Sequence, residues 1–171
     1  LMGGTGGGGE LTDPDGDGIG NAANIELGGG SGVCGRIFER AGWDEMAAAC
    51  AAVAPCPTGE ARTTPGFALA ARWVVHAVGP VWRGGQAGEE DLLRRAYESA
   101  LREGERVGAT SMAFPVVSTG VYGYPLVDGC RVALETLRDT ATSIDDVRLV
   151  AFDDTTWHAF EQLGALEAPG R

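Results

Sequence analysis

The sequence predicts an α/β fold in which helices cover both faces of a largely parallel sheet. Short apolar runs at residues 73–78, 112–117 and 147–152 have the length and composition of buried strands. Segments at residues 89–107 and 127–140 follow two of these runs and repeat apolar side chains at helical spacing. Strands that alternate with helices pair in parallel, and a parallel sheet needs cover on both faces. Ligands of such folds bind beyond the carboxyl ends of the strands.

The first third of the chain gives a weaker pattern because glycine is frequent in it. Residues 18–23 are compatible with a short strand, although their glycines weaken this prediction. Residues 33–41 and 43–53 have the apolar spacing of two helices. Prolines and a glycine at residues 55–59 then break the chain.

The last third is predicted to end in a helix over residues 153–163, which begins with acidic residues that suit a helix N-terminus. We expect one domain over residues 10–164, because a chain of 171 residues is long enough for a single core. Residues 1–9 are almost all glycine and small residues, and we expect a mobile segment there. Residues 165–171 are expected to form a frayed tail.

Composition excludes several classes of function. A net charge of −11 argues against an extended nucleic-acid surface, although it leaves room for one compact phosphate group held by backbone dipoles. We expect neither a membrane span nor a signal peptide, because the chain has no apolar run long enough for the first and lacks the N-terminal pattern of the second. The 4 cysteines lack metal-type spacing and there are only 2 histidines, so we expect no metal, no cofactor, reduced thiols and a cytoplasmic location.

Two glycine-rich loops follow predicted strands and could share one cleft. Residues 28–35 form the first loop, and residues 118–123 form the second, ahead of a helix in which Pro125 suits the first turn. Backbone N–H groups of such loops can cradle an anion, although plain turns are equally rich in glycine. No lysine follows the second loop, so it is not a P-loop. Tyr122 and Tyr124 add flat rings that could pack on a sugar or a base.

Four polar residues could carry chemistry, and each has a plainer interpretation. Asn21 is interpreted as a turn cap, whereas Asn24 is equally compatible with a cap and with binding the hydroxyls of a ribose. His76 lies within an apolar strand and is interpreted as a buried core residue. Cys34 lies near a predicted helix N-terminus that would stabilise a thiolate, but the sequence places no histidine base beside it, so we interpret it as a packing residue.

Five segments together resemble one known family. They are residues 21–24 (NAAN), 56–61 (CPTGEA), 75–82 (VHAVGPVW), 113–115 (AFP) and 118–125 (STGVYGYP). In this order they resemble the macrodomain family, and within it the MacroD-type branch, from about residue 10 to residue 160. The resemblance implies a three-layer α/β/α sandwich with a central mixed, mostly parallel sheet.

The resemblance also implies a binding site for ADP-ribose. An acidic residue near the N-terminus, here Glu10, would contact adenine, and Phe152 would pack near it. Asn24 would contact the distal ribose, and the two glycine-rich loops would clamp the diphosphate. The binding residues implied are Glu10, Leu11, Ala22, Asn24, Gly32, Val33, Ser118, Thr119, Gly120, Val121, Tyr122 and Phe152.

The chain departs from the family pattern at two places. Cys34 stands where MacroD-type hydrolases carry an aspartate that is assigned a part in positioning the attacking water, and a neutral thiol cannot accept hydrogen bonds as a carboxylate does. Residues 16–20 are richer in glycine than the family strand, so we expect a less stable edge of the fold there.

Two functions therefore compete. The first is an ADP-ribosyl hydrolase with Asn24 and Cys34 at the catalytic positions, acting on ester-linked Asp or Glu adducts, O-acetyl-ADP-ribose or ADP-ribosylated nucleic-acid ends. In the family the water is thought to be activated partly by the phosphate of the substrate. The alternative is a reader module that binds ADP-ribose without cleaving it, as the thiol at position 34 suggests. The partners implied by either function are ADP-ribose itself or an ADP-ribosylated protein or nucleic acid.

Overall fold

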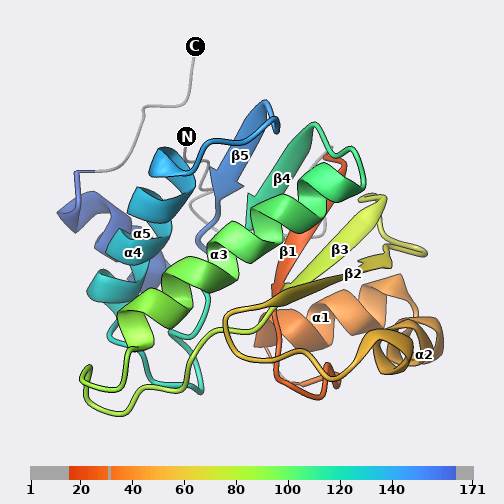
Figure 1. The fold of residues 1–171 in the computed structure, drawn as a ribbon, viewed down its shortest axis with the longest axis horizontal. Helices are drawn as coiled ribbons and strands as arrows, with labels where there is room; N and C mark the ends of the chain where they lie inside the picture. The colour runs from red at the N-terminus through yellow and green to blue at the C-terminus, as the bar shows by residue number, and fades with distance from the viewer. Residues whose placement is uncertain (1–15, 31, 165–171) are drawn as a thin grey trace.

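The computed structural model describes residues 16–30 and 32–164, and it forms a single α/β unit (Figure 1). The order along the chain is β1 (Gly18–Ala22), α1 (Gly32–Ala41), α2 (Trp43–Val53), β2 (Ala61–Pro65), β3 (Trp73–Ala77), α3 (Glu89–Arg106), β4 (Ser111–Phe114), α4 (Leu126–Asp139), β5 (Asp146–Leu149) and α5 (Asp154–Gln162). No helix within this part of the chain is both long and apolar enough to cross a bilayer.

The 5 strands form one sheet in the order β2-β3-β1-β4-β5. All neighbouring pairs are parallel except β2 and β3, which are antiparallel, so the predicted mixed and mostly parallel sheet is confirmed. Strand β2 was not predicted from the sequence. Its residues (ARTTP) lack an apolar run, because β2 lies at the edge of the sheet, where a terminal proline is tolerated.

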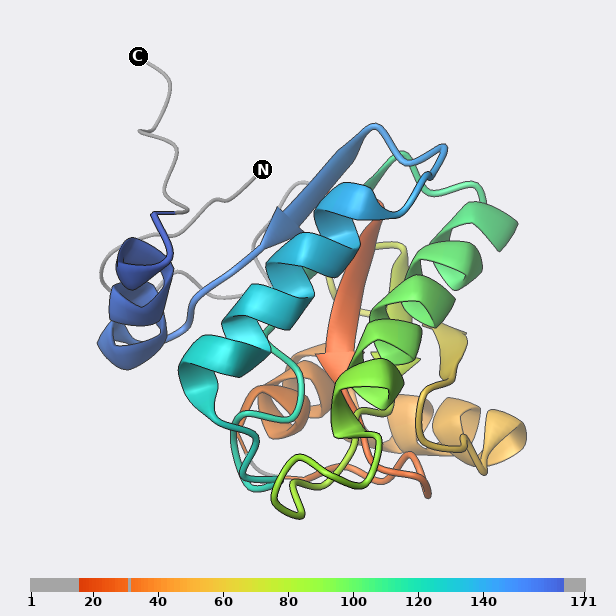
Figure 2. The same cartoon turned by 60° about the vertical axis from the view of Figure 1, so that its left-hand side comes forward.

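Helices cover the two faces of the sheet and form the predicted three layers. One buried cluster joins one face of the sheet to α1 and α2, and its largest members include Ile37, Phe38 and Met46. A second cluster joins the opposite face to α3, α4 and α5. Helices α3 and α4 pack side by side across that face, and α5 packs beside α4 at the β5 side of the sheet (Figures 1 and 2).

Strand β1 is the centre of the sheet, so residues 16–20 do not lie at an edge as we expected, and their lower stability stays a prediction. It pairs with β3 on one side and with β4 on the other. A Cβ on Gly20 would overlap the ring of Phe114, a fully buried side chain of β4. The missing side chain therefore makes room for the phenyl ring, so glycine in this strand serves the packing of the sheet.

Strands β4 and β5 end earlier than the sequence predicted, at Phe114 and Leu149 instead of residues 117 and 152. Strand β4 pairs with β1 only as far as Ala113, so the chain beyond Phe114 is free to leave the sheet. The apolar residues that continue each run leave the sheet at its carboxyl edge. This is where both faces of the α/β unit can contribute to one cavity.

Candidate functional site

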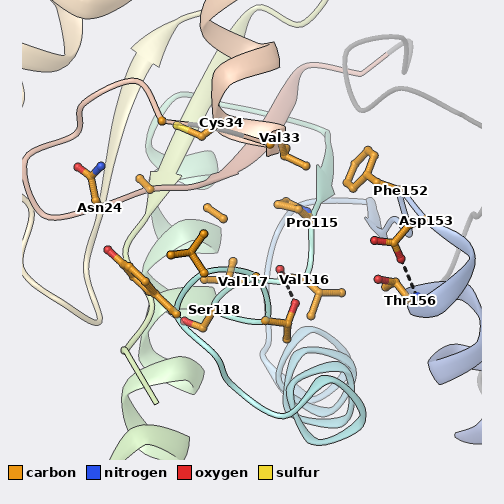
Figure 3. Close-up of a pocket in the computed structure, with 18 of the residues that line it drawn as sticks. Asn24, Val33, Cys34, Pro115, Val116, Val117, Ser118, Phe152, Asp153 and Thr156 are labelled. Carbon is orange, nitrogen blue, oxygen red and sulfur yellow. Dashed lines mark hydrogen bonds between the residues drawn. The ribbon is translucent and has the colours of Figure 1, made fainter. Parts of the chain in front are cut away.

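A cavity of about 500 Å³ opens at the carboxyl edge of β1, β4 and β5 (Figure 3). Three segments line it, and we name them by the element next to each. The α1 wall consists of Ala22, Ala23, Asn24, Gly30, Gly32, Val33 and Cys34. The β4 wall consists of Pro115, Val116, Val117, Ser118, Thr119, Gly120, Val121 and Tyr122. The β5 wall consists of Val150, Phe152, Asp153 and Thr156.

The cavity brings together nearly all of the site residues that the sequence predicted. The predicted residues that line it are Ala22, Asn24, Gly32, Val33, Cys34, Ser118, Thr119, Gly120, Val121, Tyr122 and Phe152. The two glycine-rich loops therefore do face one cavity. Glu10 and Leu11 lie outside the described residues, so their predicted contacts stay predictions. Asn24 and Phe152 lie at opposite sides of the cavity (Figure 3).

The side chain of Asn24 hydrogen-bonds to the backbone of Gly28 and so closes a turn at the start of the α1 wall. Its Oδ1 accepts a hydrogen bond from the Gly28 N–H at 3.1 Å, and its Nδ2 donates to the Gly28 carbonyl at 3.4 Å. The side chain thus caps the turn as one of the two sequence interpretations has it, and it also lines the cavity. Since the amide is only half-buried, it retains hydrogen-bonding capacity for a bound molecule.

Asn21 does not cap a turn as we expected, because it is buried within β1 beneath the α1 wall. Its Nδ2 donates to Cys34 Sγ at 3.4 Å and lies 3.0 Å from His76 Nδ1. Cys34 Sγ in turn lies 3.7 Å from the Gly28 carbonyl, to which it donates. Sequence reasoning placed no histidine near Cys34, whereas the fold links the two residues through a single asparagine.

His76 is fully buried and has a hydrogen-bonding partner at both ring nitrogens, as expected of a core histidine. The Asn21 amide can only donate through Nδ2, so Nδ1 of the imidazole must accept and Nε2 carries the proton. Nε2 lies 3.0 Å from Thr64 Oγ1 and 3.6 Å from Cys50 Sγ, and either atom can accept its proton. Burial lowers the pKa of His76 to about 4, so the ring is neutral at physiological pH.

Ser118 gives the β4 wall its shape. It is a non-glycine residue with a φ of 69°, in the left-handed region that side chains rarely adopt. Its hydroxyl is buried and has no hydrogen-bonding partner within the described part of the chain. The hydroxyl lies so close to Gly79 that a Cβ there would overlap it. A strained residue with an unpartnered hydroxyl in a cavity is typical of a ligand-binding position.

Helix α3 supports the β4 wall from behind. The hydroxyl of the fully buried Tyr97 accepts from the Val117 N–H at 2.8 Å and donates to the Pro115 carbonyl at 3.1 Å. These bonds satisfy the backbone where it leaves β4 and has no strand partner. The tyrosine thereby fixes the position at which the wall begins.

The sequence suggested that the Tyr124 ring could pack on a ligand, but the ring does not line the cavity. Its side chain is buried and packs on Trp82, with ring centroids 4.7 Å apart. Trp82 also donates its backbone N–H to the Tyr122 carbonyl at 2.8 Å. Only Tyr122 of the two tyrosines lines the cavity, and Pro125 serves as the N-cap of α4 instead of a residue of its first turn.

The cavity is suited to an anion although no lysine or arginine is among its described lining residues. The first residues of α1, beginning at Gly32, line the cavity, so the positive end of the helix dipole and its free N–H groups face it. The β4 wall adds the backbone of a tight loop, in which the Gly123 N–H returns to the Gly120 carbonyl. Backbone dipoles from two directions can therefore meet a phosphate group.

The β5 wall contains residues that the sequence did not single out, apart from Phe152. Asp153 caps α5 by accepting from the Thr156 N–H at 2.7 Å, and both residues line the cavity (Figure 3). The acidic start of α5 was a visible signal, but it indicated only a helix cap. Its place at the cavity follows from the early end of β5.

No group of three His, Cys, Asp or Glu side chains in the described ranges could hold a metal ion. All four cysteines are free and buried. Burial raises the pKa of the Cys50 and Cys56 thiols to about 11 and that of Cys130 to about 12, so these three are protonated at neutral pH. Cys34 is the cysteine that lines the cavity.

Comparisons with known proteins agree with this architecture. The chain is 43% identical over 156 residues to a macro domain-containing protein of Lactiplantibacillus plantarum, covering 89% of this chain and 90% of the relative. It superimposes with a TM-score of 0.85 on the Oceanobacillus iheyensis macrodomain with ADP, at 34% identity over 91% of this chain and 86% of that one. The Trypanosoma brucei macrodomain in complex with ADP-ribose matches with a TM-score of 0.80 at 38% identity, over 92% of this chain and 67% of that one.

The sequence model of the Macro domain family matches residues 20–133, which include the last three residues of β1, the whole α1 wall and the whole β4 wall. The family match therefore covers two of the three walls of the cavity, and the protein belongs to the macro domain family.

Proposed function

We propose that this protein binds ADP-ribose in the described cavity and hydrolyses ADP-ribose from modified macromolecules, as a member of the MacroD-type branch. One observation carries the proposal: a single cavity combines an anion-binding backbone with an asparagine side chain at one end and an aromatic ring at the other. A nucleoside diphosphate sugar has this sequence of groups. Solved relatives of this chain were crystallised with ADP or ADP-ribose, which supports the same ligand.

The walls suggest one orientation of the ligand. Adenine would pack on Phe152, and the diphosphate would lie between the first turn of α1 and residues 118–122 of the β4 wall. The distal ribose would then reach Asn24 and Cys34. The unpartnered Ser118 hydroxyl would donate to a phosphate oxygen, which would remove the cost of leaving it buried without a partner.

The reaction would be attack of water at the anomeric carbon of the distal ribose, or at the carbonyl of an ester linkage. In the first case, a bond forms between water oxygen and the anomeric carbon while the bond to the carboxylate leaving group breaks. A phosphate oxygen of the substrate would accept the proton of the water. The protein would contribute by holding the diphosphate bent toward the ribose and by stabilising charge with fixed backbone dipoles.

Cys34 supports a second function, that of a reader that binds ADP-ribose without cleaving it. The thiol donates toward the Gly28 carbonyl and accepts from Asn21, so its sulfur is engaged in local bonds. A neutral thiol is a weak acceptor and cannot replace a carboxylate in orienting a water. The α1 wall contains no acidic side chain among its described residues.

One experiment separates the two functions. Calorimetry with ADP-ribose measures binding, and incubation with glutamate-linked ADP-ribosyl protein, at enzyme in excess, measures release of the label. Binding with release supports the hydrolase. Binding without release supports the reader, and an absence of binding would refute both.

Two variants sharpen the result. Asn24→Ala should slow release by tenfold or more if the amide positions the ribose, and an unchanged rate would exclude that role. Cys34→Asp should increase release, because it restores a carboxylate that Asn21 Nδ2 already faces. An inactive wild type that stays inactive as Cys34→Asp would show that the thiol is not what prevents turnover.

The modified partner would be an ADP-ribosylated protein, or an ADP-ribosylated end of a nucleic acid. A net charge of −11 favours a partner that the protein meets only at the modification itself, since a long nucleic acid would be repelled. Matched release assays on a modified protein and on a modified single-stranded oligonucleotide test this order of preference.

A further inference from the structure

We infer that Glu89 is a positioning residue for the cavity, which holds the β4 wall in place through Trp82. The inference rests on the proposed function, because its readout is the affinity for ADP-ribose. Glu89 neither lines the cavity nor touches its described lining residues through a hydrogen bond. It acts through a chain of contacts that begins at the first residue of α3.

The Glu89 carboxylate is buried at 2% exposure and is surrounded by backbone donors. Its Oε2 accepts from the N–H groups of Arg83 at 3.1 Å and Gly85 at 2.7 Å, and its Oε1 accepts from the Ala87 N–H at 2.6 Å. The turn at residues 83–88 therefore wraps around one carboxylate. Its glycines at positions 84, 85 and 88 have φ values of 98°, 89° and 76°, so the turn has a conformation that few other residues could adopt.

Gly85 connects the turn that Glu89 holds to the side chain of Trp82. A Cβ on Gly85 would come within 2.8 Å of Cη2 of the indole, so the ring of Trp82 lies directly on the glycine. The ring also packs on Tyr124, at a centroid distance of 4.7 Å. The indole is thus confined between the turn that Glu89 holds and the end of the glycine-rich loop.

Trp82 then reaches the cavity itself. Its backbone N–H donates to the Tyr122 carbonyl at 2.8 Å, and Tyr122 is a lining residue of the β4 wall. Tyr97 supports the start of the wall at Pro115 and Val117, and the rest of the loop closes on itself through the Tyr124 N–H to Ser118 carbonyl bond of 3.0 Å. Because Ser118 is in a strained conformation, the loop needs an external support to retain its shape, and Trp82 provides it.

The carboxylate has two non-equivalent oxygens, and this predicts a graded result. Glu89→Ala removes the acceptors of all three N–H groups and should weaken ADP-ribose binding about tenfold, measured by calorimetry. Glu89→Gln can keep an oxygen at the Oε2 position, and with it the bonds to Arg83 and Gly85, but its NH2 group then faces the Ala87 N–H, so it should lose affinity less than Glu89→Ala does. Asp91→Ala is the matched control, because Asp91 is exposed in the same first turn of α3.

Two adjacent glycines give a second test that leaves the carboxylate intact. Gly84 and Gly85 both have positive φ, but a Cβ on Gly84 meets nothing within 4 Å whereas one on Gly85 meets Trp82. Gly85→Ala should weaken binding more than Gly84→Ala, although both variants add the same backbone strain. Because both glycine variants keep Glu89, this comparison of their affinities tests the inference even if Glu89→Ala does not fold.

A double-mutant cycle with Trp82→Ala separates positioning from a general structural role. If Glu89 acts through Trp82, the variant with both substitutions should bind ADP-ribose no more weakly than Trp82→Ala alone. Additive losses, or Glu89→Ala and Gly85→Ala proteins that bind as tightly as wild type, would overturn the inference. A wild type that does not bind ADP-ribose would instead overturn the proposed function, and the inference with it.

Discussion

The α1 wall and the β4 wall face the same cavity, but they are built in opposite ways. The α1 wall presents side chains whose identity matters, Asn24 and Cys34, and supports them from below with Asn21 and His76. The β4 wall presents mainly backbone around the strained Ser118. Under the proposed function, the side chains of the first wall would meet the distal ribose, and the backbone of the second would hold the diphosphate.

The supports of the two walls also differ in their origin. The α1 wall depends on the neutral imidazole of His76 on the neighbouring strand β3 and on the hydroxyl of Thr64 on β2. The β4 wall depends on α3, which contributes Tyr97 behind the wall and Glu89 beneath the adjoining turn. A change in protonation should therefore affect the first wall, whereas a change in volume should affect the second.

The largest expected effect is an added methyl group behind the β4 wall. Gly79→Ala places a Cβ in overlap with Ser118 Oγ and at 2.6 Å from Val117 Cγ1, so the wall must move. Overpacking of this kind costs up to roughly 3 kcal/mol, and we expect a loss of about a hundredfold in ADP-ribose affinity by calorimetry.

The control for this change is Gly28, which is hydrogen-bonded to Asn24 of the α1 wall. Gly28→Ala adds the same methyl group where nothing lies within 4 Å, and it should bind ADP-ribose nearly as wild type does. Equal losses in the two variants would mean that the walls do not differ in their tolerance of volume. Chemical denaturation of both proteins shows whether the loss at Gly79 is in binding or in folding.

This asymmetry explains which parts of the site could be predicted from the sequence. Glycine-rich loops after apolar runs indicated both walls, because backbone freedom and strand ends are local properties. The supports were not predicted, since Glu89 and Tyr97 reach the β4 wall through contacts that depend on how α3 crosses the sheet. Nothing in the sequence around Tyr97 distinguishes it from an ordinary core residue of an amphipathic helix.

The fold was more predictable than the contacts that support the walls of the cavity. Helix α2 and the start of α3 coincide with their predicted bounds, because helical periodicity and breaking residues are strong local signals. Strand β2 and the early ends of β4 and β5 were missed, since a strand exists only where a partner pairs with it. Asn21 was misinterpreted for the same reason: its burial is decided by the two strands on either side of β1.

The next effect is an acid sensitivity that belongs to the α1 wall. The pKa of His76 is about 4 in the folded protein because burial disfavours the charged ring, against 6.5 for an ordinary histidine. The unfolded chain therefore binds the proton more tightly, and the stability that His76 contributes is full above pH 6.5 and falls as the pH decreases toward 4. Between pH 7 and pH 5 the loss should be about 2 kcal/mol.

Urea denaturation at pH 7 and pH 5 measures this loss. His76→Gln should be less stable than wild type at pH 7 but should lose much less between the two values. His158→Gln, which changes an exposed histidine on α5, is the control for replacing a histidine outside the α1 wall. A slope that persists in His76→Gln would contradict the assignment of the acid sensitivity to the support of the α1 wall.

The smallest effect is expected at Ser118 of the β4 wall, where substitution should raise the stability of the protein and weaken its binding of ADP-ribose. Ser118→Gly relieves a φ of 69° and removes a buried hydroxyl that has no partner in the described structure. Both changes favour the folded state, so the free energy of unfolding should rise by roughly 1 kcal/mol. The same variant should bind ADP-ribose more weakly if the hydroxyl donates to a phosphate oxygen, as the proposed function has it. Ser118→Ala keeps the strain and removes only the hydroxyl, so it should share the loss of affinity with a smaller gain in stability. If instead both variants bind as wild type does, the β4 wall holds the phosphate by its backbone alone, and its contrast with the side-chain chemistry of the α1 wall is complete.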